Sequence, residues 1–166
     1  IHRWFDQALL ARVAADLPDA SFVLVGPVEE DTARLAACPN VHLLGPRPHP
    51  ALPGYIGAFD AGLIPYRLTE YTASVYPSKL NEYLAMGIPV VATGLPEIHR
   101  FNAEHGDPVA VAGTAAAFAA ALRQAVAERS PAAVARRRQE APRHGRGRQL
   151  PPHSETLAHL LRGRPH

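Results

Sequence analysis

Residues 61–92 read AGLIPYRLTEYTASVYPSKLNEYLAMGIPVVA, and this stretch decides the fold. The apolar run at 61–64 predicts a buried strand, and the run at 89–92 predicts a second one. Between them, residues 77–86 carry leucines one helical turn apart and are followed by Gly87, which predicts a helix with a glycine at its end. A strand, a helix and a strand joined by short connections form a parallel pair with a right-handed crossover.

The same alternation of patterns continues in both directions along the chain. Apolar runs predict further strands at 22–25, 41–44 and 109–111, and helical spacing predicts helices at 6–17, 51–59 and 114–128. The strands are apolar throughout rather than alternating, which is typical of a sheet covered on both faces. The sequence therefore predicts an α/β fold, an open Rossmann-like parallel sheet with helices on both faces.

Two segments differ in composition. We expect residues 1–140 to form the α/β domain, and the Pro- and Arg-rich residues 141–166 to form a C-terminal segment with room for a terminal helix at 153–162. The domain opens directly in a helix, so we expect the strand that precedes that helix in this alternation to be missing from the chain.

The composition narrows the class of protein. The 166 residues suffice for one domain, and 47% apolar with 19% charged residues is a globular composition. No apolar run approaches the ~18 residues of a membrane helix, and the N-terminus lacks a signal-peptide pattern. We expect a cytoplasmic protein, with peripheral contact at the inner face of the membrane left open. Cys38 is alone, which excludes an internal disulfide, and the scattered histidines predict no metal site.

The basic residues gather late in the chain, at Arg136, Arg137, Arg138, Arg143, Arg146 and Arg148. Such a cluster can bind nucleic acid or an anionic membrane. No aromatic residues alternate with these arginines to stack on bases, so we expect no nucleic-acid partner. The favoured interpretation is a solvated helix face followed by a loose segment.

Ligands of open α/β sheets bind beyond the carboxyl ends of the strands. This rule selects the loops at 26–31, 45–50, 66–76 and 93–99. The third loop enters a helix at Pro77, where the free amides and the helix dipole favour phosphate. Ser78 and Lys79 add a hydroxyl and an ammonium to the same place.

Glu82 lies on the same helix face as Ser78 and Lys79, one turn further along. A carboxylate there can accept hydrogen bonds from the two hydroxyls of a ribose, so the spacing suits a nucleotide. The alternative is that Lys79 and Glu82 form an exposed ion pair worth less than ~1 kcal/mol. Spacing alone does not distinguish the ribose contact from the exposed ion pair. The chain contains neither a dinucleotide-binding fingerprint nor a P-loop.

Residues 40–98 carry a longer pattern, Pro77-x-Lys79-x-x-Glu82-Tyr83-Leu84-Ala85-x-Gly87-x-Pro89-Val90-Val91, with Asn40-Val41-x-x-x-Gly45 and Leu52-x-x-Tyr55 upstream. This pattern is similar to the C-terminal, donor-binding domain of retaining GT-B glycosyltransferases, and most resembles the bacterial enzymes of teichuronic acid biosynthesis. The resemblance covers roughly residues 4–125.

The resemblance implies roles for individual residues. Glu82 matches the second acid of the family's Glu-x7-Glu motif, which holds the ribose of the donor. The first acid should fall at position 74, where this chain has Ser74, and Glu70 in the same loop is a candidate substitute. The nucleobase would lie against Gly45, Pro46, Arg47 and Pro48. The diphosphate would be wrapped by Ser74, Val75, Tyr76, Pro77, Ser78 and Lys79. The candidate catalytic residues are Lys79 and Glu70.

The resemblance also implies a reaction. It is the transfer of a sugar from a nucleotide-diphosphate sugar to an acceptor with retention, without a metal or other cofactor. The acceptor would bind to an N-terminal domain that this chain lacks, so we expect the chain to be inactive alone. Two alternatives stay open: half of a GT-B nucleotide-sugar epimerase, and a non-catalytic nucleotide-binding module, which the serine at position 74 keeps open.

Overall fold

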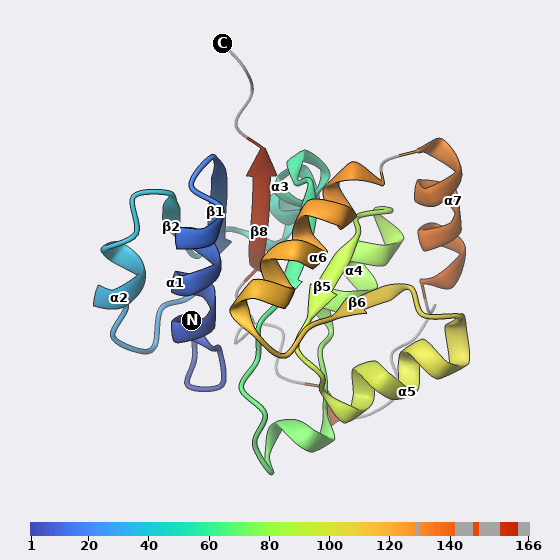
Figure 1. The fold of residues 1–166 in the computed structure, drawn as a ribbon, viewed down its shortest axis with the longest axis horizontal. Helices are drawn as coiled ribbons and strands as arrows, with labels where there is room; N and C mark the ends of the chain where they lie inside the picture. The colour runs from blue at the N-terminus through green and yellow to red at the C-terminus, as the bar shows by residue number, and fades with distance from the viewer. Residues whose placement is uncertain (129, 142–147, 150–156, 163–166) are drawn as a thin grey trace.

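The computed structural model describes residues 1–128, 130–141, 148–149 and 157–162. Helices cover both faces of a central sheet in this part of the chain (Figure 1). The α-helices are α1 (Gln7–Asp16), α2 (Ala33–Ala36), α3 (Leu52–Ala58), α4 (Lys79–Ala85), α5 (Pro96–His105), α6 (Ala115–Ala127) and α7 (Pro131–Glu140), with short 3₁₀ turns η1 (His49–Ala51) and η2 (Thr72–Ser74). The strands are β1 (Ala20–Val25), β2 (Val41–Gly45), β3 (Ala61–Ile64), β4 (Val75–Tyr76), β5 (Val90–Ala92), β6 (Val109–Val111), β7 (Arg148–Gln149) and β8 (Leu157–Arg162).

Six of the strands form one sheet in the order β2-β1-β8-β3-β5-β6. β1 pairs with β2, β3 with β5 and β5 with β6, all in parallel, which confirms the predicted strands and the Rossmann-like α/β fold. Helices α2 and α5 were not among the predicted elements, whereas α7 carries the arginines for which the sequence predicted a helix face. Within the helices that the structure describes, none is long and apolar enough to cross a bilayer.

β8 corrects the prediction for the C-terminal segment. Residues 157–162 form a strand rather than a helix, and residues 153–156 lie outside the described residues. β8 runs antiparallel between β1 and β3, so the centre of the sheet is mixed rather than purely parallel. A six-residue stretch with three leucines is compatible with either state, and here the backbone N–H and C=O groups of two strands in the middle of a sheet require a partner.

A second part of the C-terminal segment is also paired. β7 pairs in parallel with β4, in the loop that was selected as a candidate site. The sequence predicted a loose segment at residues 148–149, but these residues are held against residues 75–76. Arg143 and Arg146 lie outside the described residues.

The core is divided by the sheet into two clusters. One joins α1 and α6 over one face through Leu10, Val13, Phe22, Phe118 and Leu122. The other joins α3, α4 and α5 over the opposite face through Ile56, Leu80, Tyr83, Ile98 and Phe101. Figure 1 shows α1 and α6 in front of the strands and α3 and α4 behind them. Burial on both faces explains why the strands are apolar throughout.

Arg137 corrects the prediction of a solvated arginine face. Its side chain is buried, and it donates hydrogen bonds to the backbone oxygens of Glu128, at 3.0 Å, and Gly87, at 3.5 Å. Arg137 thus fixes α7 against the turn between α4 and β5. Its neighbours Arg136 and Arg138 are exposed, as expected for a solvated face.

Candidate functional site

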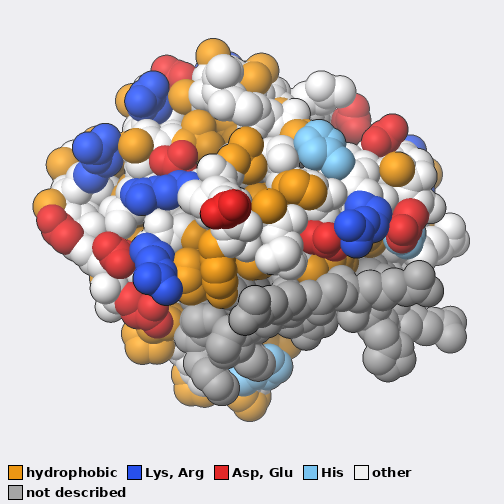
Figure 2. Space-filling model, turned by 90° about the horizontal axis from the view of Figure 1, so that it is seen from below, with side chains coloured by type: hydrophobic (Ala, Val, Ile, Leu, Met, Phe, Trp, Pro, Cys, Tyr) orange, Lys and Arg blue, Asp and Glu red, His pale blue; other side chains and the backbone are white. Residues whose placement is uncertain are grey.

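The loops at the carboxyl edge of the sheet lie close together. The amide of Gly26 donates to the oxygen of Gly45 at 3.0 Å, which joins the loops after β1 and β2. The hydroxyl of Thr93 accepts from the amide of Tyr66 at 3.1 Å and donates to its oxygen at 2.7 Å, which joins the loops after β3 and β5. Figure 2 looks onto this edge and shows hydrophobic side chains interspersed with charged side chains of both signs.

The loop between β3 and α4 is folded around Thr72, which is fully buried. The Thr72 hydroxyl donates to the backbone oxygen of Arg67 at 2.6 Å and accepts from the amide of Thr69 at 2.8 Å. A short polar side chain that bonds to its own loop backbone stabilises a turn. The loop therefore has a defined shape before it reaches Ser74 and β4.

Val75 and Tyr76 lie in β4 with their side chains in the core. Only their backbone could face a ligand. The Tyr76 hydroxyl donates to Oδ1 of Asn81 at 2.5 Å, and burial, together with the charge of Glu97, raises the pKa of Tyr76 to about 12. Tyr76 is therefore a neutral anchor between β4 and α4.

Helix α4 brings two of the predicted site residues together. The turn begins at Pro77, whose oxygen accepts from the amide of Leu80 at 3.1 Å, and the regular helix begins at Lys79. Nζ of Lys79 lies 2.9 Å from Oε1 and 3.1 Å from Oε2 of Glu82. The ion pair predicted as the alternative is therefore formed.

The ion pair is not an exposed one, however. The Lys79 side chain is only 6% exposed, whereas the Glu82 side chain is 34% exposed. Burial of the ammonium makes it depend on the carboxylate, because a buried charge that loses its partner is strongly unfavourable. A carboxylate offers about four lone-pair directions, so Glu82 can bind Lys79 and still accept hydrogen bonds from a ligand.

The loop after β2 presents an arginine at the same edge. Gly45 has a φ of +70°, a conformation that favours glycine, and it turns the chain at the end of the strand. Nε of Arg47 donates to the hydroxyl of Tyr55 in α3 at 3.1 Å, so the exposed guanidinium is oriented. Pro46 and Pro48 are exposed on either side of it.

Glu70 and Ser74 lie on the exposed side of the loop between β3 and β4. The Ser74 hydroxyl donates to the backbone oxygen of Tyr71 at 3.2 Å, so it contributes to the local turn. The role of Glu70 as a substitute for an acid at position 74 stays a prediction, as do the donor contacts of the other site residues.

The N-terminal residues were not predicted to belong to the site. Residues 1–6 lie at the carboxyl edge, and the amide of Arg67 donates to the oxygen of Trp4 at 2.7 Å. A signal for this was present in the sequence: α1 precedes β1, and a helix that leads into a parallel strand starts at the carboxyl edge of the sheet.

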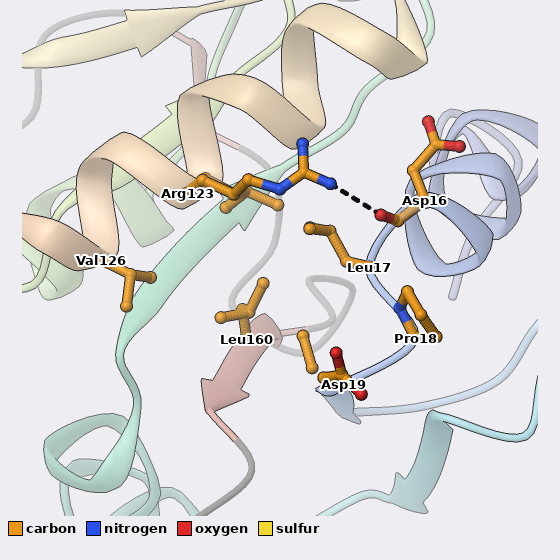
Figure 3. A pocket seen from close by; sticks show the side chains of 9 residues that line it. Asp16, Leu17, Pro18, Asp19, Arg123, Val126 and Leu160 are labelled. Carbon is orange, nitrogen blue, oxygen red and sulfur yellow. Dashed lines mark hydrogen bonds between the residues drawn. The ribbon is translucent and has the colours of Figure 1, made fainter.

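A cavity of about 240 Å³ lies at the opposite, amino edge of the sheet (Figure 3). It is lined by the end of α1, the turn into β1, one side of α6 and Leu160 of β8, and Arg123 donates across it to the backbone oxygen of Asp16 at 2.8 Å. It contains none of the predicted site residues. Among the described residues, no group of three or more His, Cys, Asp or Glu side chains could hold a metal ion.

Comparison with known proteins gives two findings. The sequence profile of a family described as Glycosyl transferases group 1 matches residues 2–128. The chain is also similar to TuaH of Bacillus subtilis (strain 168), which is assigned by name to teichuronic acid biosynthesis as a glycosyltransferase. The two are 32% identical over 101 residues, which cover 58% of this chain and 25% of TuaH. The match thus spans about a quarter of that relative's length.

Proposed function

The chain belongs to the glycosyl transferases group 1 family, and from this premise we propose that it forms the donor-binding surface of a glycosyltransferase. The donor is a nucleotide-diphosphate sugar, and the sugar is transferred to an acceptor with retention at the anomeric carbon. The acceptor binds to other parts of the parent protein, so the chain alone binds the donor without turning it over. From the name of TuaH, the product belongs to a cell-envelope polysaccharide.

The observation that carries this proposal is the pairing of Lys79 with Glu82 at the carboxyl edge. A ribose would place its two hydroxyls against the outer, partly exposed side of the Glu82 carboxylate. The diphosphate would lie one turn earlier, against the backbone of residues 74–78 and the ammonium of Lys79. The nucleobase would lie against the loop that carries Arg47.

The chemistry of the leaving group agrees with this arrangement. Breaking the bond to the sugar leaves negative charge on the nucleoside diphosphate, and donors that are already in place stabilise that charge most effectively. The ammonium of Lys79 is held in place by Glu82, and we expect the backbone amides at the start of the helical turn to contribute to the same anion site. This stabilisation uses no divalent ion.

Position 74 carries a serine and no carboxylate. Glu70, in the same loop, would take the place of that carboxylate and face the transferred sugar. If Glu70 acts in this way, Glu70→Gln in the full-length parent should lower the rate of transfer and leave the affinity for the nucleoside diphosphate unchanged. The anomeric configuration of the product, read by NMR, tests retention.

The test of donor binding is calorimetry with nucleoside diphosphates, in buffer containing EDTA. Glu82→Gln keeps the size of the side chain and one oxygen to accept from Lys79, but it weakens the contact with ribose. We expect the dissociation constant to rise about tenfold, which corresponds to about 1.4 kcal/mol, the scale of one hydrogen bond to a charged group.

Glu104→Gln is the matched control, because Glu104 is exposed on α5, away from the site, and loses the same charge. It should bind like the wild type, and thermal unfolding should show that both variants are folded. Equal affinity of the wild type and Glu82→Gln would refute the ribose contact. Absence of binding by the wild type, or binding only without EDTA, would refute the donor site as described.

A further inference from the structure

The loop between β3 and β4 is joined along its first residues to the N-terminal segment. Phe5 forms an antiparallel bridge with Tyr66. On either side of this bridge, the amide of Asp6 donates to the oxygen of Pro65, and the amide of Arg67 donates to the oxygen of Trp4, both at 2.7 Å. The position of the first residues of the loop therefore depends on the position of the N-terminal segment.

The rest of the loop meets the same segment through two aromatic rings. Trp4 stacks on Tyr71, with the ring centroids 5.1 Å apart and the planes 28° from parallel. The indole also lies beside His2, at 4.4 Å between centroids, and Arg3, whose guanidinium carbon lies 5.4 Å from the centroid, and it packs against one of the two core clusters. Nε1 of Trp4 is buried and has no hydrogen-bond partner among the described residues. Trp4 is therefore held by contacts of its ring, which another aromatic ring can replace.

The loop has little other support on its outer side. Leu68 is 63% exposed and Tyr71 is 44% exposed, and within the described part of the chain the Thr72 side chain bonds to atoms of the same loop. Those internal bonds give the loop its shape, and the end of the loop is held by η2 against α5 and by the buried side chains of Val75 and Tyr76. On the outer side of the loop, before η2, the stack between Trp4 and Tyr71 adds a contact with the N-terminal segment.

We propose that Trp4 is a positioning residue for the donor: by stacking on Tyr71, it sets where residues 69–74 lie against the diphosphate and the sugar. This inference rests on the proposed function, since it assigns Trp4 a part in the same site. Trp4 acts through the loop and does not touch the donor.

The test compares the binding of a nucleoside diphosphate with that of the corresponding nucleoside. Trp4→Leu should raise the dissociation constant of the diphosphate about three- to tenfold. The affinity for the nucleoside should change less than twofold, because base and ribose contact the Arg47 loop and Glu82 instead. Trp4→Phe keeps a ring on Tyr71 and should restore diphosphate binding to within about twofold of the wild type.

Two further variants complete the design. Tyr71→Leu should match Trp4→Leu, and the double variant should be no weaker than either, since both remove the same contact. Because Tyr71 is exposed, Tyr71→Leu should fold, and it tests the same contact if Trp4→Leu fails to fold. Leu68→Ala is the matched control, as it removes an exposed apolar side chain from the same loop and should bind like the wild type.

A spectroscopic signal follows the same contact. Trp4 is the single tryptophan of the chain, so its fluorescence reports on the stack. Titration with a nucleoside diphosphate should shift the emission of the wild type, and Tyr71→Leu should remove most of that shift.

The outcomes separate the two proposals. If Trp4→Leu and Tyr71→Leu bind the nucleoside diphosphate as tightly as the wild type does, the role of Trp4 is refuted and the donor site is not. Equal losses for the diphosphate and the nucleoside also overturn it, since they indicate general destabilisation. No binding by the wild type overturns the donor site, and the role of Trp4 with it.

Discussion

At the scale of single residues, the burial of Lys79 changes the role that the spacing of Lys79 and Glu82 predicts for this ion pair. Residues three apart on a helix suggest an ordinary surface ion pair. The structure buries the ammonium and leaves the carboxylate partly exposed, so one member of the pair is fixed and the other can meet a ligand. For this reason Glu82→Gln, which keeps one oxygen to accept from Lys79, is a sounder probe than Glu82→Ala, which removes both of these acceptors from the buried ammonium.

His2 gives a prediction at the same scale. Its ring is buried beside Trp4 and Tyr66, and burial, helped by the positive charge of the amino terminus, lowers the pKa of His2 from 6.5 to about 3. Between pH 6.5 and pH 3, His2 therefore binds a proton in the unfolded chain but not in the folded chain. The contribution of His2 to the unfolding free energy is complete above pH 6.5 and is lost as the pH falls toward 3.

The comparison is denaturant unfolding of the wild type and His2→Phe at pH 7.5 and pH 5. Phenylalanine keeps an aromatic ring and removes the titration. Between the two pH values, the wild type should lose about 1–2 kcal/mol more unfolding free energy than the variant. Parallel losses in both proteins would show that His2 is already charged or paired in the folded state.

At the scale of elements, the site depends on how closely α4 lies against the sheet. A Cβ atom on Gly62 of β3 would lie 2.5 Å from Cδ2 of Tyr83, a fully buried ring of α4. Glycine at this position allows the close contact. The helix that carries Lys79 and Glu82 is thus positioned by a residue without a side chain on the neighbouring strand.

Gly62→Ala should therefore destabilise the fold by about 1–3 kcal/mol, the usual effect of overpacking a core. Gly54→Ala is the matched control, because Gly54 lies in α3 with no atom within 4 Å of the added Cβ, and alanine should be neutral or slightly stabilising there. Urea unfolding measures both variants. Wild-type stability of Gly62→Ala would mean that α4 shifts without loss, and donor binding would then show whether the site moved with it.

At the scale of the whole molecule, the C-terminal segment completes the sheet. Leu160 of β8 is 3% exposed and packs in the core cluster under α1 and α6. Its strand pairs with β1 on one side and β3 on the other. The two halves of the sheet are thus connected through a segment that is distant from both in the chain.

Leu160→Ala should lower the unfolding free energy by about 2–4 kcal/mol, as for other buried leucines. Leu68→Ala, at a position that is 63% exposed, should change it by less than about 0.5 kcal/mol. Thermal and urea unfolding give both values. A small effect of Leu160→Ala, similar to that of Leu68→Ala, would contradict the central position of β8.

The sequence determined the parts of this protein that depend on neighbouring residues. Apolar runs located β1, β3 and β6, and leucine spacing located α4, because the faces that a helix or strand buries repeat with a local period. Helix α5 was missed since its first turns carry a histidine, an arginine and an asparagine within the pattern. The motif from Pro77 to Val91 and the family followed from short-range order as well.

The tertiary structure decided what depends on residues far apart in the chain. Residues 157–162 could form a helix or a strand, and their pairing with β1 and β3 selected the strand. Likewise, no local pattern indicates that Arg137 is buried, or that Trp4 stacks on Tyr71 across the site. The physical reason is that backbone hydrogen bonds and ring contacts at the centre of a fold are satisfied by whichever segment packing brings there, and a local sequence pattern does not record that partner.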